Sequence, residues 1–98
     1  MGMYNEVFKK CPECGARMEV QIPQIVFGFG GFDLDDPSTY KNLSADERND
    51  LFDGIKDKTF FCEKCHSPSQ SLVVECPDCK AILQISSNKK IVFVMHRT

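Results

Sequence analysis

The chain has 98 residues, of which 42% are apolar and 27% are charged, and its formal net charge is −2. These values are typical of one small folded domain, and a net acidic chain is a poor general ligand for nucleic acid. No apolar run approaches the roughly 20 residues of a membrane span, and the first residues lack the basic and apolar segments of an export signal. We therefore expect a cytoplasmic protein with no membrane contact.

The first part of the chain predicts one strand and one glycine-rich segment. Residues 18–22 are apolar at every second position, which is the period of a strand with one buried face, and Pro23 ends this strand. Residues 25–32 are apolar but interrupted by three glycines. Because glycine weakens a strand, this segment is either a second strand that loosens into a loop or a loop whose phenylalanines contact a partner.

One helix is predicted between residues 44 and 56. Ser44 can cap the free amides of the first turn, and Glu47, three residues later, completes a capping box. The apolar stripe that would face the core consists of Leu51, Phe52 and Ile55. Gly54, followed by two lysines, is expected to close the helix near residue 55 or 56.

The second half of the chain is expected to be all-β. Strands are predicted at residues 59–61, 71–75, 81–85 and 91–95, with a turn at 86–90. The last two strands and this turn would form an antiparallel hairpin at the C-terminal end.

The cysteines carry the strongest signal in the chain. They form three Cys-x-x-Cys pairs: Cys11 and Cys14, Cys62 and Cys65, and Cys76 and Cys79. This spacing lets both sulfurs of a pair bind one ion, and two such pairs complete a closed tetrahedral four-cysteine site. Thiols stay reduced in the cytoplasm, so we expect Zn²⁺, with these six cysteines as candidate ligands, rather than three disulfides.

The residues alone leave open which pairs share an ion. The most local site joins Cys62 and Cys65 to the third pair across ten residues, with a turn at residues 67–70, whereas joining the first pair to the second crosses 47 residues. Loop-closure entropy separates these choices by only about 1–1.5 kcal/mol. The remaining pair could bind a second zinc ion with His66 and His96, stay as free thiols, or complete a site across a dimer interface. Neither histidine has zinc-finger spacing, so the favoured interpretation of both is a surface residue without a metal.

One family resemblance bears on this choice. The Cys-Pro-Glu-Cys-Gly knuckle at residues 11–15, the strand after it, the acidic helical segment and Thr-Phe-Phe-Cys-x-x-Cys at residues 59–65 resemble the CpXC domain, a bacterial family with two such knuckles. The resemblance covers about residues 10–74. It implies that the first two cysteine pairs share the zinc ion, and it implies no established activity. The third knuckle has no counterpart in that family.

Together these features predict a small α+β zinc-ribbon-like domain. Antiparallel β-hairpins would surround a four-cysteine zinc site, and one short helix would lie in an insertion. We expect residues 1–98 to form a single zinc-bound domain. Within it, residues 8–22 would carry the first knuckle, residues 24–57 would form an acidic helical insertion, and residues 58–98 would carry the other two knuckles and the C-terminal hairpin.

Several catalytic interpretations are disfavoured. Residues 62–66 match the Cys-x-x-Cys-His motif of covalent haem attachment, but that chemistry needs an exported protein. A redox Cys-x-x-Cys motif needs a low-pKa thiol at a helix N-terminus, whereas these pairs precede strands or turns. The glycine-rich segment lacks phosphate-binding spacing, and no carboxylate pair or Ser, His and Asp grouping has catalytic spacing. We therefore expect no enzymatic activity.

The favoured function is a zinc-stabilised protein-interaction module, a small regulatory or accessory protein that docks on a protein complex. Its acidic insertion and glycine-rich segment would form the docking surface, because the longest insertion is both acidic and aromatic. The alternative is a nucleic-acid-binding zinc ribbon associated with transcription. Its basic surface would consist of Lys80, Lys89, Lys90 and Arg97, in a segment that carries no acid.

Overall fold

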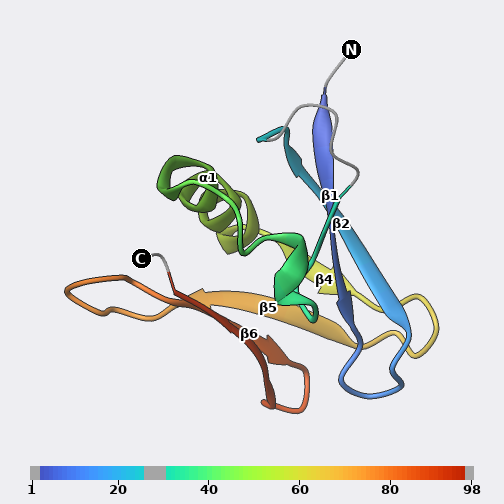
Figure 1. The fold of residues 1–98 in the computed structure, drawn as a ribbon. Helices are drawn as coiled ribbons and strands as arrows, with labels where there is room; N and C mark the ends of the chain where they lie inside the picture. Colours follow the sequence, from blue (N-terminus) through green and yellow to red (C-terminus); the bar gives the residue numbers. More distant parts are fainter. Residues whose placement is uncertain (1–2, 26–30, 97–98) are drawn as a thin grey trace.

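The computed structural model describes residues 3–25 and 31–96 and has an α+β fold (Figure 1). The described part of the chain forms two β-sheets, one α-helix and a short 3-10 helix, η1 (Pro37–Thr39), which the sequence did not predict. No helix in this part is long and apolar enough to cross a membrane. Residues 26–30 of the glycine-rich segment and Arg97 lie outside the described residues, so the roles expected for them stay predictions.

The first sheet has three strands in the order β2–β1–β3. They are β1 (Tyr4–Lys10), β2 (Arg17–Pro23) and β3 (Gly31–Asp33). β1 and β2 form an antiparallel hairpin, and β3 pairs in parallel with β1. β2 contains the strand predicted at residues 18–22 and ends at Pro23, as predicted.

The strand β1 was not predicted from the sequence, because its buried face is largely polar. Asn5, Val7 and Lys9 alternate toward the core and are each at most 1% exposed. Only one of these three side chains is apolar, so the alternation that reveals a half-buried strand is missing from the sequence. The side-chain oxygen of Asn5 accepts a hydrogen bond from the amide of Ile25 (2.7 Å), which satisfies part of this buried polar face.

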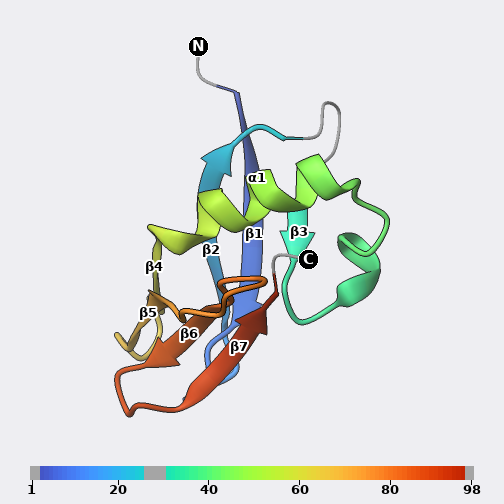
Figure 2. The same cartoon turned by 90° about the vertical axis from the view of Figure 1, so that its left-hand side faces the viewer.

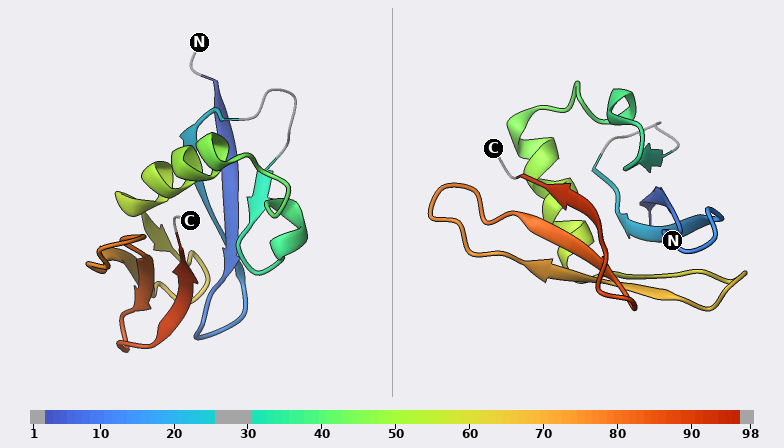
Figure 3. Two further views of the ribbon diagram at one scale, coloured as in Figure 1. Left: turned by 60° about the vertical axis from the view of Figure 1, so that its left-hand side comes forward. Right: turned by 90° about the horizontal axis from the view of Figure 1, so that it is seen from below.

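The second sheet has four antiparallel strands in the order β4–β5–β6–β7 (Figure 3). They are β4 (Thr59–Phe61), β5 (Pro68–Val73), β6 (Ile82–Ser86) and β7 (Ile91–Met95). The predicted bounds of β4 and β7 and the predicted C-terminal hairpin are confirmed. The turn predicted at residues 67–70 is wrong: the second knuckle itself reverses the chain, and β5 begins at Pro68. Proline is tolerated there because it is the first residue of the strand.

The helix α1 (Ala45–Lys56) has the predicted capping box. The amide of Glu47 donates to Ser44 Oγ (3.2 Å), and the amide of Ser44 donates to Glu47 Oε1 (2.9 Å). The predicted apolar stripe of Leu51, Phe52 and Ile55 is buried. The helix ends at Lys56, within the predicted range, but Gly54 is not its terminal residue. It lies inside α1, where a Cβ atom would stand 2.9 Å from the Cβ atom of Ile22 in β2, so glycine permits close packing of α1 on the first sheet.

One hydrophobic core joins both sheets and α1, which lies across the first sheet (Figure 2). Its buried members are Val7, Cys11, Met18, Ile22, Phe32, Leu34, Leu51, Phe52, Ile55, Phe60, Cys62, Ile82 and Met95. Five of these residues belong to the acidic segment between residues 24 and 57. That segment is therefore an integral part of the core and cannot be removed as an appendage.

A buried polar network connects the end of α1 to the second sheet. The hydroxyl oxygen of Ser71 lies 2.9 Å from the carbonyl oxygen of Ile55 and 2.8 Å from that of Lys58. It also accepts a hydrogen bond from the side-chain amide of Gln84, whose oxygen accepts one from Ser69 (3.2 Å). Because these groups are shielded from water, the network fixes the distance between helix and sheet.

Candidate metal centre

Two of the hairpins are closed by turns of the same type. The first knuckle connects β1 to β2, and the second connects β4 to β5. In the first, the amide of Gly15 donates to the carbonyl of Cys11 (2.9 Å), and in the second, the amide of His66 donates to that of Cys62 (2.8 Å). Gly15 and His66 both have a left-handed backbone, with φ of 77° and 60°. Glycine adopts this conformation freely, whereas histidine is held there by the rest of the turn.

The two knuckles bring four sulfur atoms together. The Sγ atoms of Cys11, Cys14, Cys62 and Cys65 all lie within 4.8 Å of one another. Cys11 is 3.4 Å from Cys65, and Cys14 is 3.5 Å from Cys62. These distances exceed the about 2.05 Å of a disulfide bond and are close to the about 3.8 Å expected in a tetrahedral site with metal–sulfur bonds of about 2.3 Å. This four-cysteine group could therefore hold one metal ion.

The group joins the pairs implied by the resemblance to the CpXC family, and not the more local second and third pairs. The two hairpins meet because β2 and β4 contact each other. Cys11 and Cys62, the first cysteine of each knuckle, are only 2% and 1% exposed, whereas the second cysteine of each faces solvent to a greater degree. Cys76 and Cys79 are not part of the group and lie on the connection between β5 and β6.

The thiols of the group differ in proton affinity. A hydrogen bond from the Ser67 side chain, opposed by desolvation and assisted by the thiol of Cys11, lowers the pKa of Cys65 to about 6. At Cys14 a hydrogen bond from the Ala16 amide acts to lower the pKa, but desolvation and the neighbouring thiols together raise it to about 12. An ion that binds all four sulfurs must therefore displace protons, so its affinity depends on pH.

Lys9 places a buried ammonium group within electrostatic range of Cys11. Its side chain is 1% exposed, Nζ has no hydrogen-bond partner among the described residues, and this atom lies 5.7 Å from the centroid of the Phe60 ring. Burial lowers the pKa of Lys9 to about 8, opposed by the negative charges of Asp35 and Cys11. A divalent ion bound by four thiolates leaves a net negative charge, which a buried ammonium group offsets. The residues present therefore fit a metal–thiolate centre, and no sequence pattern had singled out Lys9.

The third knuckle repeats the turn outside the four-cysteine group. The amide of Lys80 donates to the carbonyl of Cys76 (3.2 Å). The sulfur of Cys79 lies 3.5 Å from Nδ1 of His96. His66 instead packs beside an aromatic ring of β4, with ring centroids 5.8 Å apart. Of the two histidines, His96 is thus the one that contacts a knuckle through its ring nitrogen.

A strand, rather than a helix, follows each knuckle: β2 after the first, β5 after the second and β6 after the third. Activation of a thiol by a helix N-terminus is therefore missing at all three pairs. Both cysteines of the Cys-x-x-Cys-His motif, Cys62 and Cys65, also belong to the four-cysteine group. The arrangement favours metal binding over thiol redox chemistry and over haem attachment.

The basic residues of the nucleic-acid alternative are not gathered in the described part of the chain. Lys80 precedes β6, whereas Lys89 and Lys90 follow it. A strand of five residues separates the two positions by about 16 Å. These three side chains therefore mark opposite ends of the C-terminal hairpin.

No protein-family model, curated protein or solved structure matches this chain. The resemblance to the CpXC family and to zinc ribbons therefore rests on the Cys-x-x-Cys knuckles of the sequence alone. What the structure defines is a small α+β domain with a four-cysteine group that could hold a metal ion.

Proposed function

We propose that this chain is a structural-zinc protein-interaction module, a small accessory protein that binds a partner rather than catalysing a reaction. One Zn²⁺ bound by the four-cysteine group would hold the two hairpins together. Four thiolates are the donor set of closed structural zinc sites, which leave no coordination position for a substrate. The proposal includes a cytoplasmic location, because the cysteines must stay reduced. The observation that carries it is the exposed outer face of the second sheet.

The outer face of the second sheet is the side that faces away from α1. Leu72, Leu83 and Val94 lie opposite one another on β5, β6 and β7 and form an apolar row across three strands. Leu72 and Val94 are 52% and 43% exposed, and Phe61 on β4 is 51% exposed. Large apolar side chains gathered on a solvent-facing sheet are a feature of interaction sites.

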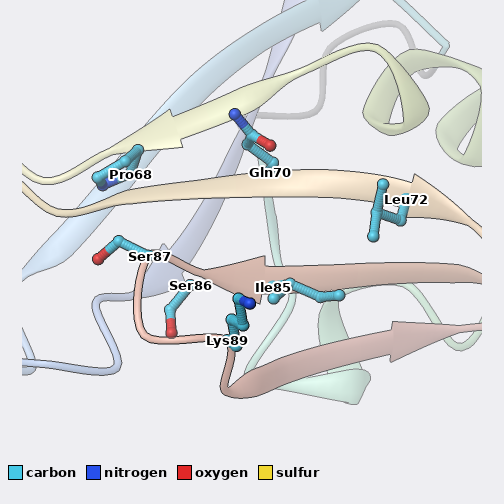
Figure 4. Close-up of a pocket in the computed structure, with 7 residues that line it drawn as sticks. All are labelled: Pro68, Gln70, Leu72, Ile85, Ser86, Ser87 and Lys89. Atoms are coloured by element: carbon cyan, nitrogen blue, oxygen red, sulfur yellow. The ribbon is translucent and has the colours of Figure 1, made fainter.

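A hollow of about 440 Å³ lies in this outer face (Figure 4). Its lining includes the apolar side chains of Pro68, Leu72 and Ile85, and its one charged lining residue is Lys89. The occupant is a segment of a partner protein that inserts an apolar side chain and places a carboxylate near Lys89, because this pairing is complementary in both polarity and charge.

We propose this outer face, rather than the acidic segment, as the docking surface. The helix in that segment buries its apolar stripe and presents mainly charged residues to solvent. Deleting residues 24–57 would remove part of the core, so loss of binding by such a deletion would report unfolding. Single substitutions on the outer face are the appropriate test, because they leave the core intact.

Selection of a random displayed peptide library against the zinc-loaded full chain tests this proposal. We expect the enriched peptides to combine an apolar residue with a neighbouring Asp or Glu. The affinity of one such synthetic peptide should fall at least tenfold in Leu72→Glu and in Lys89→Glu. Asp50→Lys is the matched control, because it reverses an exposed charge on α1 and should leave the affinity unchanged.

Five results would contradict the proposal. If the selection enriches no peptide, or if the peptides bind Leu72→Glu as tightly as the natural chain, the outer face is not a docking surface. A dimer that dissociates in Leu72→Glu would make a second copy the occupant. Oligonucleotide binding that is lost in Lys89→Glu/Lys90→Glu would favour the nucleic-acid alternative. Absence of zinc from the purified reduced protein would remove the structural-zinc part.

A further inference from the structure

The third knuckle has the turn of a metal-binding knuckle, although it takes no part in the four-cysteine group. The amide of Lys80 donates to the carbonyl of Cys76, as Gly15 and His66 do in the other two knuckles. Lys80 has a left-handed backbone with φ of 46°, a conformation uncommon for lysine. The same turn in all three knuckles indicates that the third pair is also arranged for binding.

The C-terminal hairpin brings a third ligand to this knuckle. Cys79 lies before β6 and His96 follows β7, and the ladder that pairs Ile82 with Met95 brings both to the same end of the hairpin. The distance from Cys79 Sγ to His96 Nδ1 is 3.5 Å. In a tetrahedral zinc site with bonds of about 2.3 Å to sulfur and about 2.05 Å to nitrogen, this distance would be about 3.6 Å. Cys79 and His96 therefore already have the separation of two zinc ligands. The ligand atoms of Cys76, Cys79 and His96 do not all lie within 4.8 Å of one another, so an ion would draw the three side chains closer together.

The surroundings of the third knuckle differ from those of the four-cysteine group. Cys76 and Cys79 are half-buried and His96 is exposed, whereas Cys11 and Cys62 are buried in the core. Two thiolates and one neutral imidazole balance the charge of Zn²⁺, so this site needs no buried counter-charge. A position beyond these three ligands would face solvent.

We propose that Cys76, Cys79 and His96 bind a second zinc ion, with three protein ligands and a fourth position open to an external ligand. This site goes beyond the proposed function, because the four-cysteine group is complete without it. An exposed site with one protein ligand fewer exchanges its ion more readily than a closed one. The chain thus combines one structural ion with one exchangeable ion.

A stepwise chelator titration of the zinc-loaded full chain, followed by native mass spectrometry under reducing conditions, tests this site. We expect two ions per chain at the start. One of them should leave at a much lower chelator concentration than the other. Cys76→Ser/Cys79→Ser should start with one ion. His96→Ala should lower the affinity for the exchangeable ion about 100-fold, because even substitutions of residues that only support a direct ligand lower metal affinity 10–100-fold. Asn88→Ala, in the exposed turn at the other end of the C-terminal hairpin, is the control and should leave both steps unchanged.

Three outcomes would overturn the second site. One ion per chain in the natural protein would leave the third knuckle unloaded. If His96→Ala still binds two ions and loses the exchangeable one at the same chelator concentration, the contact between Cys79 and His96 is only a hydrogen bond. Three ions per two chains, falling to two in Cys76→Ser/Cys79→Ser, would show that the pair shares an ion between copies. The test is independent of the proposed function, because these variants leave both the four-cysteine group and the outer face of the second sheet intact.

Discussion

The sulfur atoms of Cys11 and Cys65 lie 3.4 Å apart although the residues are 54 positions apart in the chain. Closing a flexible loop of that length costs roughly 3.5 kcal/mol of chain entropy before any constant term. The contact between β2 and β4 and the shared core offset this cost by bringing the two hairpin ends together. An ion bound there would act as a cross-link between the two sheets.

We expect removal of the ion from the four-cysteine group to unfold the domain. Cys11→Ser, or excess chelator added to the natural chain, should abolish cooperative thermal unfolding, because binding energy at a structural zinc site is folding energy, on the order of 10 kcal/mol or more. Circular dichroism during heating measures this. Cys79→Ser is the control and should still unfold cooperatively. An unchanged melting curve for Cys11→Ser would show that the hairpins hold without an ion.

Gly54→Ala should destabilise the protein although alanine is the better helix former. The gain in helix propensity is about 1 kcal/mol, but the new Cβ would stand 2.9 Å from Ile22 Cβ. Forcing α1 away from β2 costs about 1–3 kcal/mol, as overpacking does elsewhere. Denaturant unfolding measures the net loss. Asp50→Ala, at an exposed position of the same helix, should be neutral or slightly stabilising, and equal stabilisation by both substitutions would refute the close contact.

Ser71→Ala should lower the free energy of unfolding by about 1–3 kcal/mol. The substitution removes the hydroxyl that bonds the carbonyls at the end of α1 and accepts from Gln84, so buried polar groups lose their partner. Ser87→Ala, in the exposed turn of the C-terminal hairpin, should change stability little. If both variants unfold at the same denaturant concentration, the network contributes nothing measurable.

Tyr40 should make the folded state sensitive to alkaline pH. Burial, opposed by the charge of Arg48 and reinforced by nearby carboxylates, raises the pKa of Tyr40. The unfolded chain loses this proton at about pH 10 and the folded chain at a higher pH. The free energy of unfolding should therefore fall as pH rises above about 10, and this fall should be smaller in Tyr40→Phe.

The titration of Tyr40 can be followed alone in Tyr4→Phe, because the chain has two tyrosines. Phenolate absorbance in the folded Tyr4→Phe chain should have its midpoint above 10. A midpoint at or below that value would show that burial of the ring does not shield the phenol.

Local patterns were readable from the sequence. The three knuckles follow from the spacing of the cysteines, and α1 follows from the capping box of Ser44 and Glu47 and from its apolar stripe. β7 and β4 follow from short apolar and β-branched runs. All of these depend on residues within a few positions of one another, where backbone geometry alone decides which side chains meet.

Other features of the fold were not readable. β1 has a polar buried face, so Asn5 and Lys9 gave no periodic signal, and their burial depends on strands elsewhere in the chain. Glycine is common at helix ends, which is why Gly54 was expected to close the helix. Its role is instead set by close packing against Ile22, which is far away in the sequence. The apolar outer face of the second sheet exists only because strand pairing aligns side chains from separate segments.

The sequence by itself determined that the cysteines form three pairs with the spacing of metal ligands, but the tertiary structure decided that the first and second pairs meet. The reason is that loop-closure entropy grows only slowly with loop length, so the chain between two knuckles hardly favours one pairing over another. Burial of a common core selects between pairings, because it depends on contacts that no local pattern contains. That core places Cys11 beside Cys65 and leaves Cys79 beside His96 at the end of the C-terminal hairpin.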